Sequence, residues 1–150
     1  LAIEGKKTFE ASDCELKKPA PSYTVETVKH FKAEYGEDAL IHWLIGADSI
    51  DDLAYWYKIV ELIDACIVTT MYRAGCALPD FTKFEPQWGS IRVEKLQRYV
   101  IQTSLIDISS TEIRNRIASG RDVAGMLSPS VAEYIREHGL YQAKLTANGE

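Results

Sequence analysis

The stretch ISSTEIR, residues 108–114, holds the side chains of this sequence best suited to bind a phosphate. It ends an apolar run and opens an amphipathic helix, in which Ser110 and Arg114 stand four residues apart and so share one flank. Free backbone N–H groups, two hydroxyls and a guanidinium then meet at a helix N-terminus, where the helix dipole favours anions. Ser110, Thr111 and Arg114 are therefore candidate phosphate ligands.

The same stretch is also a good helix start without any ligand. With Ser109 as the N-cap, Glu112 lies three residues further on and completes a capping box. Glu112 and Arg116 stand four residues apart, the spacing of an ion pair on a helix surface. The stretch alone leaves the capped helix and the phosphate site equally open.

Gly46 and Asp48 end a second apolar run, in the stretch LIGADS. A glycine there lets the backbone approach a ligand or another segment closely. A carboxylate at the tip of a strand can accept a hydrogen bond from a ribose hydroxyl or an adenine amine. Taken alone, the stretch favours the plainer interpretation, in which Asp48 and Ser49 cap the helix that follows.

Aromatic, basic and hydroxyl side chains lie in three further stretches, AYWYK, YRAG and PSYT. Trp56 and Tyr57 are of types that an amphipathic helix commonly buries, but a ring near the mouth of a sheet can also stack on a planar heterocycle. Arg73 has the bidentate fork suited to a phosphate, or is a solvated loop residue. Thr24, in PSYT, is an ordinary helix cap whose donors can also bind a small carboxylate.

Apolar runs that alternate with amphipathic stretches must position these loops. Short continuous apolar runs predict buried strands of a parallel sheet, and apolar residues at helical spacing predict helices. The expected strands are 8–16 (at an edge), 39–46, 65–72 and 100–108. The expected helices are 25–35, one or two short ones after a Ser49–Asp52 capping box, 91–99, one after Ser109 and one after Ser128, with a long loop over 73–90.

This layout predicts an α/β fold whose parallel sheet is covered by helices on both sides. In such folds ligands bind at the carboxyl ends of the strands. LIGADS, TTMYRAG and ISSTEIR each follow directly on an expected strand. We therefore expect the candidate residues to lie at one edge of the sheet.

Composition excludes several classes of protein. A chain of 150 residues with 46% hydrophobic content suits one globular domain, and no second domain is visible. The net charge of −5 argues against a nucleic-acid partner, and no apolar run approaches the length of a membrane span. The three cysteines lack the spacing of a zinc site or a disulfide framework, so we expect no protein metal site and a reducing cytoplasm.

Taken in order, PSYT, GADS, the tryptophan of AYWYK and ISSTEIR resemble bacterial nicotinate-nucleotide adenylyltransferases, of the nucleotidyltransferase superfamily. The resemblance runs from about Phe9 to Tyr141 and implies a Rossmann-like parallel sheet sandwiched by helices. It implies transfer of an adenylyl group from ATP, with Mg²⁺, to nicotinate mononucleotide. The products are nicotinate adenine dinucleotide, on the route to NAD, and pyrophosphate.

The resemblance also implies roles for the candidate residues. On the ATP side, Ser110, Thr111 and Arg114 would hold phosphates, while Gly46 and Asp48 would meet the adenosine.

For the mononucleotide, the resemblance implies that Thr24 and nearby backbone donors bind the nicotinate carboxylate. It implies that Trp56 stacks on the pyridine ring, that Tyr57 contributes backbone groups, and that Arg73 lies near the phosphate of the mononucleotide.

The glycine-rich opening of that family, which ends in an HxGH element that binds ATP and stabilises the transition state, does not occur in these 150 residues. No catalytic residue is therefore assigned. We expect residues 1–150 to be the C-terminal part of a single nucleotidyltransferase domain that lacks its first strand and loop, and to be inactive alone.

Two alternatives stay open. The chain can belong to a nucleotidyltransferase that acts on nicotinamide mononucleotide or phosphopantetheine, or to a non-catalytic nucleotide-binding module. A homo-oligomer is compatible with either, and the expected loop over 73–90 is long enough to close over a substrate.

Overall fold

The computed structural model describes residues 1–104 and 108–142, which form two compact units. The larger unit runs from Ser12 to Ser104, and the smaller one joins Leu1–Ala11 to the described residues from Ile108 onward. Within these ranges, no helix has the length and apolarity that crossing a bilayer requires.

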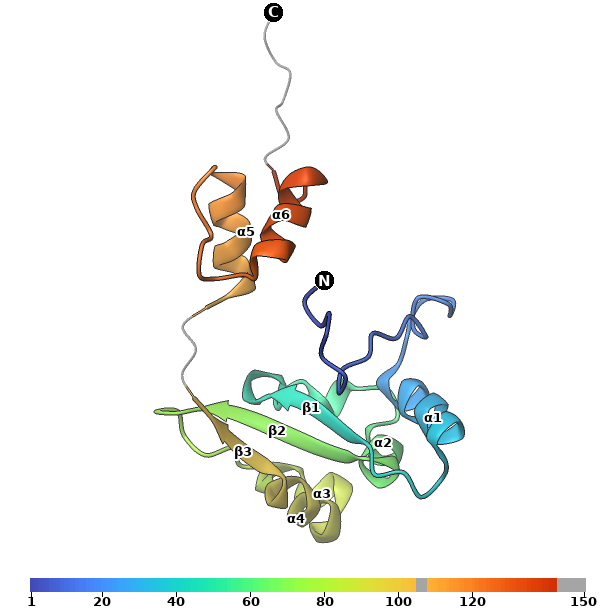
Figure 1. Cartoon of the computed structure of the whole chain (residues 1–150). Helices are drawn as coiled ribbons and strands as arrows, with labels where there is room; N and C mark the ends of the chain where they lie inside the picture. Colours follow the sequence, from blue (N-terminus) through green and yellow to red (C-terminus); the bar gives the residue numbers. More distant parts are fainter. Residues whose placement is uncertain (105–107, 143–150) are drawn as a thin grey trace, which may run out of the picture. The chain divides into compact units, whose positions relative to one another are not determined.

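The larger unit is built on a three-stranded parallel sheet in the order β1-β2-β3 (Figure 1). Its strands are β1 (His42–Gly46), β2 (Ile67–Arg73) and β3 (Val100–Thr103). Gly46 pairs with Met71 and Arg73 with Thr103, so all three carboxyl ends lie at the same edge. The expected strands over 39–46, 65–72 and 100–108 are confirmed with changed bounds, although residues 105–107 lie outside the described part of the chain. The expected burial is confirmed only at the centre of β2, because Leu44 of β1 and Ile101 of β3 are exposed.

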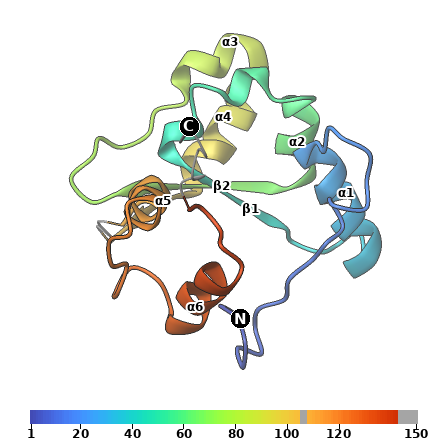
Figure 2. The ribbon, with the colours of Figure 1, turned by 90° about the horizontal axis from the view of Figure 1, so that it is seen from above.

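Helices connect these strands, as a parallel sheet requires. The α-helices are α1 (Thr24–Tyr35), α2 (Ile59–Ala65), α3 (Glu85–Trp88) and α4 (Ser90–Arg98), and the 3-10 helices are η1 (Ala47–Ser49), η2 (Leu53–Tyr55) and η3 (Thr82–Phe84). α2 and α4 pack on β2, and α3 and α4 lie beneath the sheet in Figure 1. α2 also packs on α1, and the two helices lie side by side in Figure 2. Ile45 and Val68 of the sheet join Leu62 of α2 and Leu96 of α4 in one buried core. The expected α/β fold is confirmed.

The expected edge strand over 8–16 is wrong. The chain forms turns there, and Glu15 is tied to the start of α1. The Thr27 hydroxyl donates to the Glu15 carboxylate at 2.6 Å, and the Ser22 hydroxyl donates to the Glu15 carbonyl at 3.3 Å. The segment alternates between residue types, but its apolar members are too few to build a buried strand face.

The expected long loop over 73–90 is wrong in its second half, which contains η3 and α3. Phe81, Phe84 and Trp88 are buried there, and the rings of Phe84 and Trp88 stack with centroids 4.1 Å apart. Their spacing of three and four residues is the helical apolar pattern, which the prolines and glycines around it obscure. Closure of the whole loop over a substrate would expose this aromatic cluster.

The expected Ser49–Asp52 capping box is not formed either. Ser49 is the last residue of η1, and no side chain caps η1 or η2. The segment instead turns through two 3-10 helices that bring Ile50 and Leu53 into the core.

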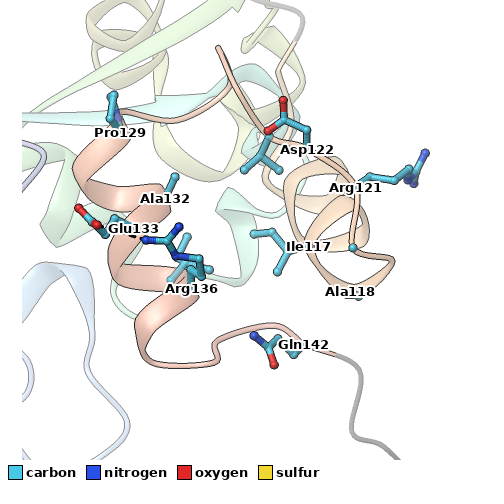
Figure 3. Close-up of a pocket in the computed structure, with 12 residues that line it drawn as sticks. Ile117, Ala118, Arg121, Asp122, Pro129, Ala132, Glu133, Arg136 and Gln142 are labelled. Carbon is cyan, nitrogen blue, oxygen red and sulfur yellow. Dashed lines mark hydrogen bonds and ion pairs between the residues drawn. The ribbon is translucent and has the colours of Figure 1, made fainter.

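The smaller unit contains the two expected helices, α5 (Ser110–Ala118) and α6 (Pro129–Glu137), both confirmed. Ile113 of α5 is buried, whereas α6 buries no residue. A cavity of about 780 Å³ lies between them, and in Figure 3 Ile117 of α5 and Ala132 of α6 both line it. Ser128 makes no side-chain cap, and Gly139 follows α6 with a φ of 59°.

Replacing Phe81 by alanine tests the packing of residues 81–88 into the core. Phe81 is fully buried, so we expect Phe81→Ala to lower the free energy of unfolding by about 3–5 kcal/mol. Leu78→Ala is the control, because Leu78 is 61% exposed in the same connection, and its cost should stay within about 0.5 kcal/mol. Urea unfolding of both variants measures this, and equal midpoints would show that the segment is not part of the core.

Candidate functional site

The candidate residues divide between the two units. The proposed phosphate ligands Ser110, Thr111 and Arg114 lie in the first turns of α5, in the smaller unit. The others lie in the larger unit, on α1, at the ends of β1 and β2, and around η2: Thr24, Gly46, Asp48, Trp56, Tyr57 and Arg73.

The N-terminus of α5 is capped as expected, but by half of a capping box. The Ser109 hydroxyl accepts from the Glu112 N–H at 3.0 Å. The Glu112 carboxylate does not turn back to Ser109 and instead accepts from Arg116 Nε at 2.9 Å. Arg116 also donates to the Asp122 carbonyl at 3.3 Å, so its guanidinium is engaged within the helix and the turn that follows it.

Arg114 lies beside the candidate hydroxyls and is less engaged than Arg116. Its Nη2 donates to the Thr111 hydroxyl at 3.2 Å, and Ser110 makes no side-chain hydrogen bond within the described residues. All three side chains are exposed. The helix cap and the candidate anion-binding group are therefore compatible, because they use different residues of the same turn.

Asp48 folds back over the end of β1. A Cβ placed on Gly46 would lie 2.2 Å from Asp48 Oδ1, so only glycine leaves room for the carboxylate in this position. Asp48 is exposed and hydrogen-bonds to no described residue. The close approach expected at Gly46 is thus made by a side chain of the same loop, which presents a free acceptor at the carboxyl edge of the sheet.

The loops around Thr24 and Tyr57 are held together by an aromatic contact. Tyr23 is the N-cap of α1, and its ring lies against that of Tyr57, with centroids 4.2 Å apart and planes inclined by 31°. No side chain caps α1, and the Thr24 hydroxyl has no partner within the described residues. The Tyr57 N–H also donates no hydrogen bond there.

Trp56 and Arg73 differ in how far they are free to meet a ligand. The Trp56 ring is half-buried and packs against the core, which agrees with ordinary packing on that side and leaves part of the ring exposed. Arg73 ends β2 and is exposed, and its guanidinium contacts no described acceptor. Its carbonyl accepts from the Cys76 N–H at 3.1 Å, which starts the next turn.

Sequence reasoning missed Tyr23 and Lys58. Tyr23 precedes Thr24 in PSYT, so the motif contained the signal, but nothing in it indicated a partner more than thirty residues away. Lys58 has a φ of 52°, in the left-handed region that residues other than glycine seldom adopt, and no residue type marks such a position.

Charged side chains surround this turn. Glu61, beside Lys58, raises the pKa of the Lys58 ammonium, mainly by its charge. A hydrogen bond from Lys29 of α1 lowers the pKa of the Glu61 carboxyl. Lys58 therefore keeps its positive charge at neutral pH.

Metal-ligating side chains do not gather in the described part of the chain. No group of three or more His, Cys, Asp or Glu side chains there can hold a metal ion. His42, for example, lies 3.0 Å by Nδ1 from the Thr69 hydroxyl, away from any carboxylate cluster.

Comparison with known proteins identifies the family to which this chain belongs. The model of the cytidylyltransferase-like family matches residues 1–116. A probable nicotinate-nucleotide adenylyltransferase of Pectobacterium atrosepticum is 34% identical over 95% of this chain and 71% of its own length. A relative of the same description from Dehalococcoides mccartyi is 34% identical over 94% of this chain and 68% of its own length.

A solved structure shares the fold at lower identity. The nicotinic acid mononucleotide adenylyltransferase of Plasmodium falciparum, in complex with NaAD, superposes with a TM-score of 0.54 at 18% identity. The match covers 81% of this chain and 58% of that one, so the chain spans less than two thirds of the solved protein. The match of residues 1–116 and the 34% identity to curated relatives show that this chain belongs to the nicotinate-nucleotide adenylyltransferase family of cytidylyltransferase-like proteins.

Proposed function

We propose that this chain forms the C-terminal part of an enzyme domain that transfers the adenylyl group of ATP to nicotinate mononucleotide, in NAD biosynthesis. The observation that carries the proposal is the aromatic contact between Tyr23 and Tyr57, which joins the two loops to which the proposal assigns the nicotinate carboxylate. The three cysteines are free, which fits a place in the reducing cytoplasm.

The reaction needs no protein nucleophile. A phosphate oxygen of the mononucleotide attacks the α-phosphorus of ATP and forms the new P–O bond. The bond between the α-phosphorus and the oxygen that bridges to the β-phosphorus breaks, and pyrophosphate leaves with the electron pair. The protein contributes by positioning the two phosphates and by stabilising charge that develops between them.

On the ATP side, the proposal gives the phosphates to Ser110, Thr111 and Arg114. It is supported by the free Ser110 hydroxyl and by a guanidinium that lies at the N-terminus of α5. Gly46 and Asp48 would meet the adenosine, because the Asp48 carboxylate is exposed and unpaired within the described residues.

On the mononucleotide side, the proposal gives the nicotinate carboxylate to Thr24 and to the backbone of Tyr57. Both supply donors without partners in the described residues. Trp56 would stack on the pyridine ring with the exposed part of its own ring. Arg73 would meet the phosphate of the mononucleotide as a bidentate donor.

Mg²⁺ enters this proposal with ATP, as part of the substrate. The described residues offer no cluster of ligating side chains, so the phosphates themselves would carry most of its coordination. The HxGH element is absent from the 150 residues, and we propose that it must be supplied for turnover.

The choice of mononucleotide tests the proposal directly. We expect the 150-residue chain to bind nicotinate mononucleotide more tightly than nicotinamide mononucleotide, but not to release pyrophosphate from ATP. A chimaera in which the HxGH-containing opening of a relative precedes Leu1 should release pyrophosphate, and faster with the nicotinate form. Calorimetric titration and a coupled pyrophosphate assay measure this. Equal binding and equal rates with both mononucleotides would contradict the proposal.

Arg114 is the residue whose loss should weaken ATP binding most. A charge-assisted hydrogen bond is worth about 1.5–3 kcal/mol, so Arg114→Ala should raise the Kd for MgATP by about 10- to 150-fold. Arg136→Ala is the matched control, since it removes the same charge from an exposed arginine of α6 in the same unit. The prediction fails if both variants lose ATP affinity equally in calorimetric titration.

Gly46 should act through Asp48. An alanine at position 46 must displace the Asp48 carboxylate, so Gly46→Ala and Asp48→Ala should weaken ATP binding by a similar amount, about five- to tenfold. The double variant should be no worse than Asp48→Ala. Asp52→Ala, an equal charge change at an exposed residue of the same segment, is the control. Additive losses in the double variant would show that Gly46 acts independently.

A further inference from the structure

Tyr23 and Tyr57 form a ring contact between segments that are far apart in sequence. Tyr23 stands directly before Thr24 at the start of α1, and Tyr57 stands between Trp56 and Lys58 before α2. Their centroids are 4.2 Å apart, and the inclination of 31° gives a tilted stack. The contact therefore joins the two loops to which the proposed function assigns the pyridine carboxylate.

The turn over residues 56–58 has an energetically unfavourable backbone conformation. Lys58 holds a φ of 52°, a conformation that costs free energy and persists where surrounding contacts enforce it. The Lys58 ammonium lies 5.4 Å from the centre of the Tyr57 ring and 3.4 Å from the Glu61 carboxylate. The Tyr57 ring thus contacts the Tyr23 ring and the Lys58 ammonium, and these contacts add to the backbone hydrogen bond from the Ile59 N–H to the Trp56 carbonyl, 3.2 Å long, which closes the turn.

The donors in this region have no partners of their own. The N–H groups of Tyr57 and Lys58 donate no hydrogen bond within the described residues, and the Thr24 hydroxyl makes none there. Tyr23, as N-cap, has no side-chain acceptor near enough to satisfy the first N–H groups of α1. The ring contact therefore holds two sets of unsatisfied donors beside each other.

We propose that Tyr23 is a positioning residue, whose ring holds the Trp56–Tyr57 turn against the start of α1 and thereby sets the preference for an anionic pyridine substituent. The inference rests on the proposed function, since it concerns the same substrate. Tyr23 does not touch the substrate in this account. It acts through Tyr57, whose backbone donor is aligned only while the two rings are in contact.

Packing of α1 on α2 does not depend on this contact. Val25 and Val28 of α1 are buried in the same core as Leu62 of α2. Lys29 of α1 also pairs with Glu61 of α2. Loss of the Tyr57 ring, which is 46% exposed, should therefore leave the fold intact.

The test compares two mononucleotides on one set of variants of this chain. Tyr57→Ala and Tyr23→Ala should each raise the Kd for nicotinate mononucleotide by about two- to tenfold, the scale of one aromatic pair. The Kd for nicotinamide mononucleotide should rise by a smaller factor, because it shares the stack on Trp56 but has no carboxylate, so the Kd for nicotinamide mononucleotide divided by that for nicotinate mononucleotide falls. Tyr23→Phe keeps the ring and should restore the ratio. The double alanine variant should bind nicotinate mononucleotide no more weakly than the single variant that binds it less tightly.

Tyr55→Ala is the control, since Tyr55 is 86% exposed in the same segment and makes no ring contact within the described residues. Thermal midpoints establish that each variant is folded, and Tyr57→Ala serves if Tyr23→Ala is unstable. The inference is overturned if folded Tyr57→Ala binds both mononucleotides as the parent does, or loses both equally. If the parent chain itself binds neither mononucleotide, the proposed function fails, and that result does not depend on any variant.

Discussion

Strand β2 is paired on both sides, and this double pairing decides where the loops of the larger unit leave the sheet. Val68, Thr69 and Thr70 at its centre are at most 2% exposed, so the strand has no freedom to shift its register. Because both neighbours run parallel to it, the chain leaves β1 after Gly46 and β2 after Arg73 at one edge. Free side chains of both loops, Asp48 and Arg73, consequently stand at that edge.

The strands could be predicted from the residue types of short segments, although only β2 is buried at its centre. Residues 42–46 are mostly apolar, and residues 67–73 are rich in β-branched residues, so short length and residue type together favour strands. Residues 8–16 alternate without enough apolar side chains, so local contacts with α1 prevail there. The aromatic residues of 81–88 carry a helical pattern, but prolines and glycines next to them suggested a loop, and only the completed core explains why Phe81 is buried.

The site was predictable in its residue types and not in its contacts. The cap of α5 by Ser109 follows from local sequence, because donor and acceptor are three residues apart. Which partner Glu112 takes does not, since Arg116 and the Ser109 N–H compete for one carboxylate. The contact of Tyr23 with Tyr57 depends on how α1 and α2 pack against each other, and the residue pattern along the sequence does not predict that packing. The position of Asp48 over Gly46 could be predicted in part. The glycine indicated a close approach, but the sequence did not show that the Asp48 side chain makes it.

A reaction without a protein nucleophile depends on geometry held in advance, which explains why strain at Lys58 can be tolerated. A turn that is unfavourable by itself keeps its N–H groups out of local hydrogen bonds and so free for a ligand. The turn must then be held by contacts that do not use those donors. The side-chain contacts of Tyr23, Tyr57 and Lys58 meet this requirement. The Ile59 N–H also closes the turn by donating to the Trp56 carbonyl, and this bond leaves the N–H groups of Tyr57 and Lys58 unused.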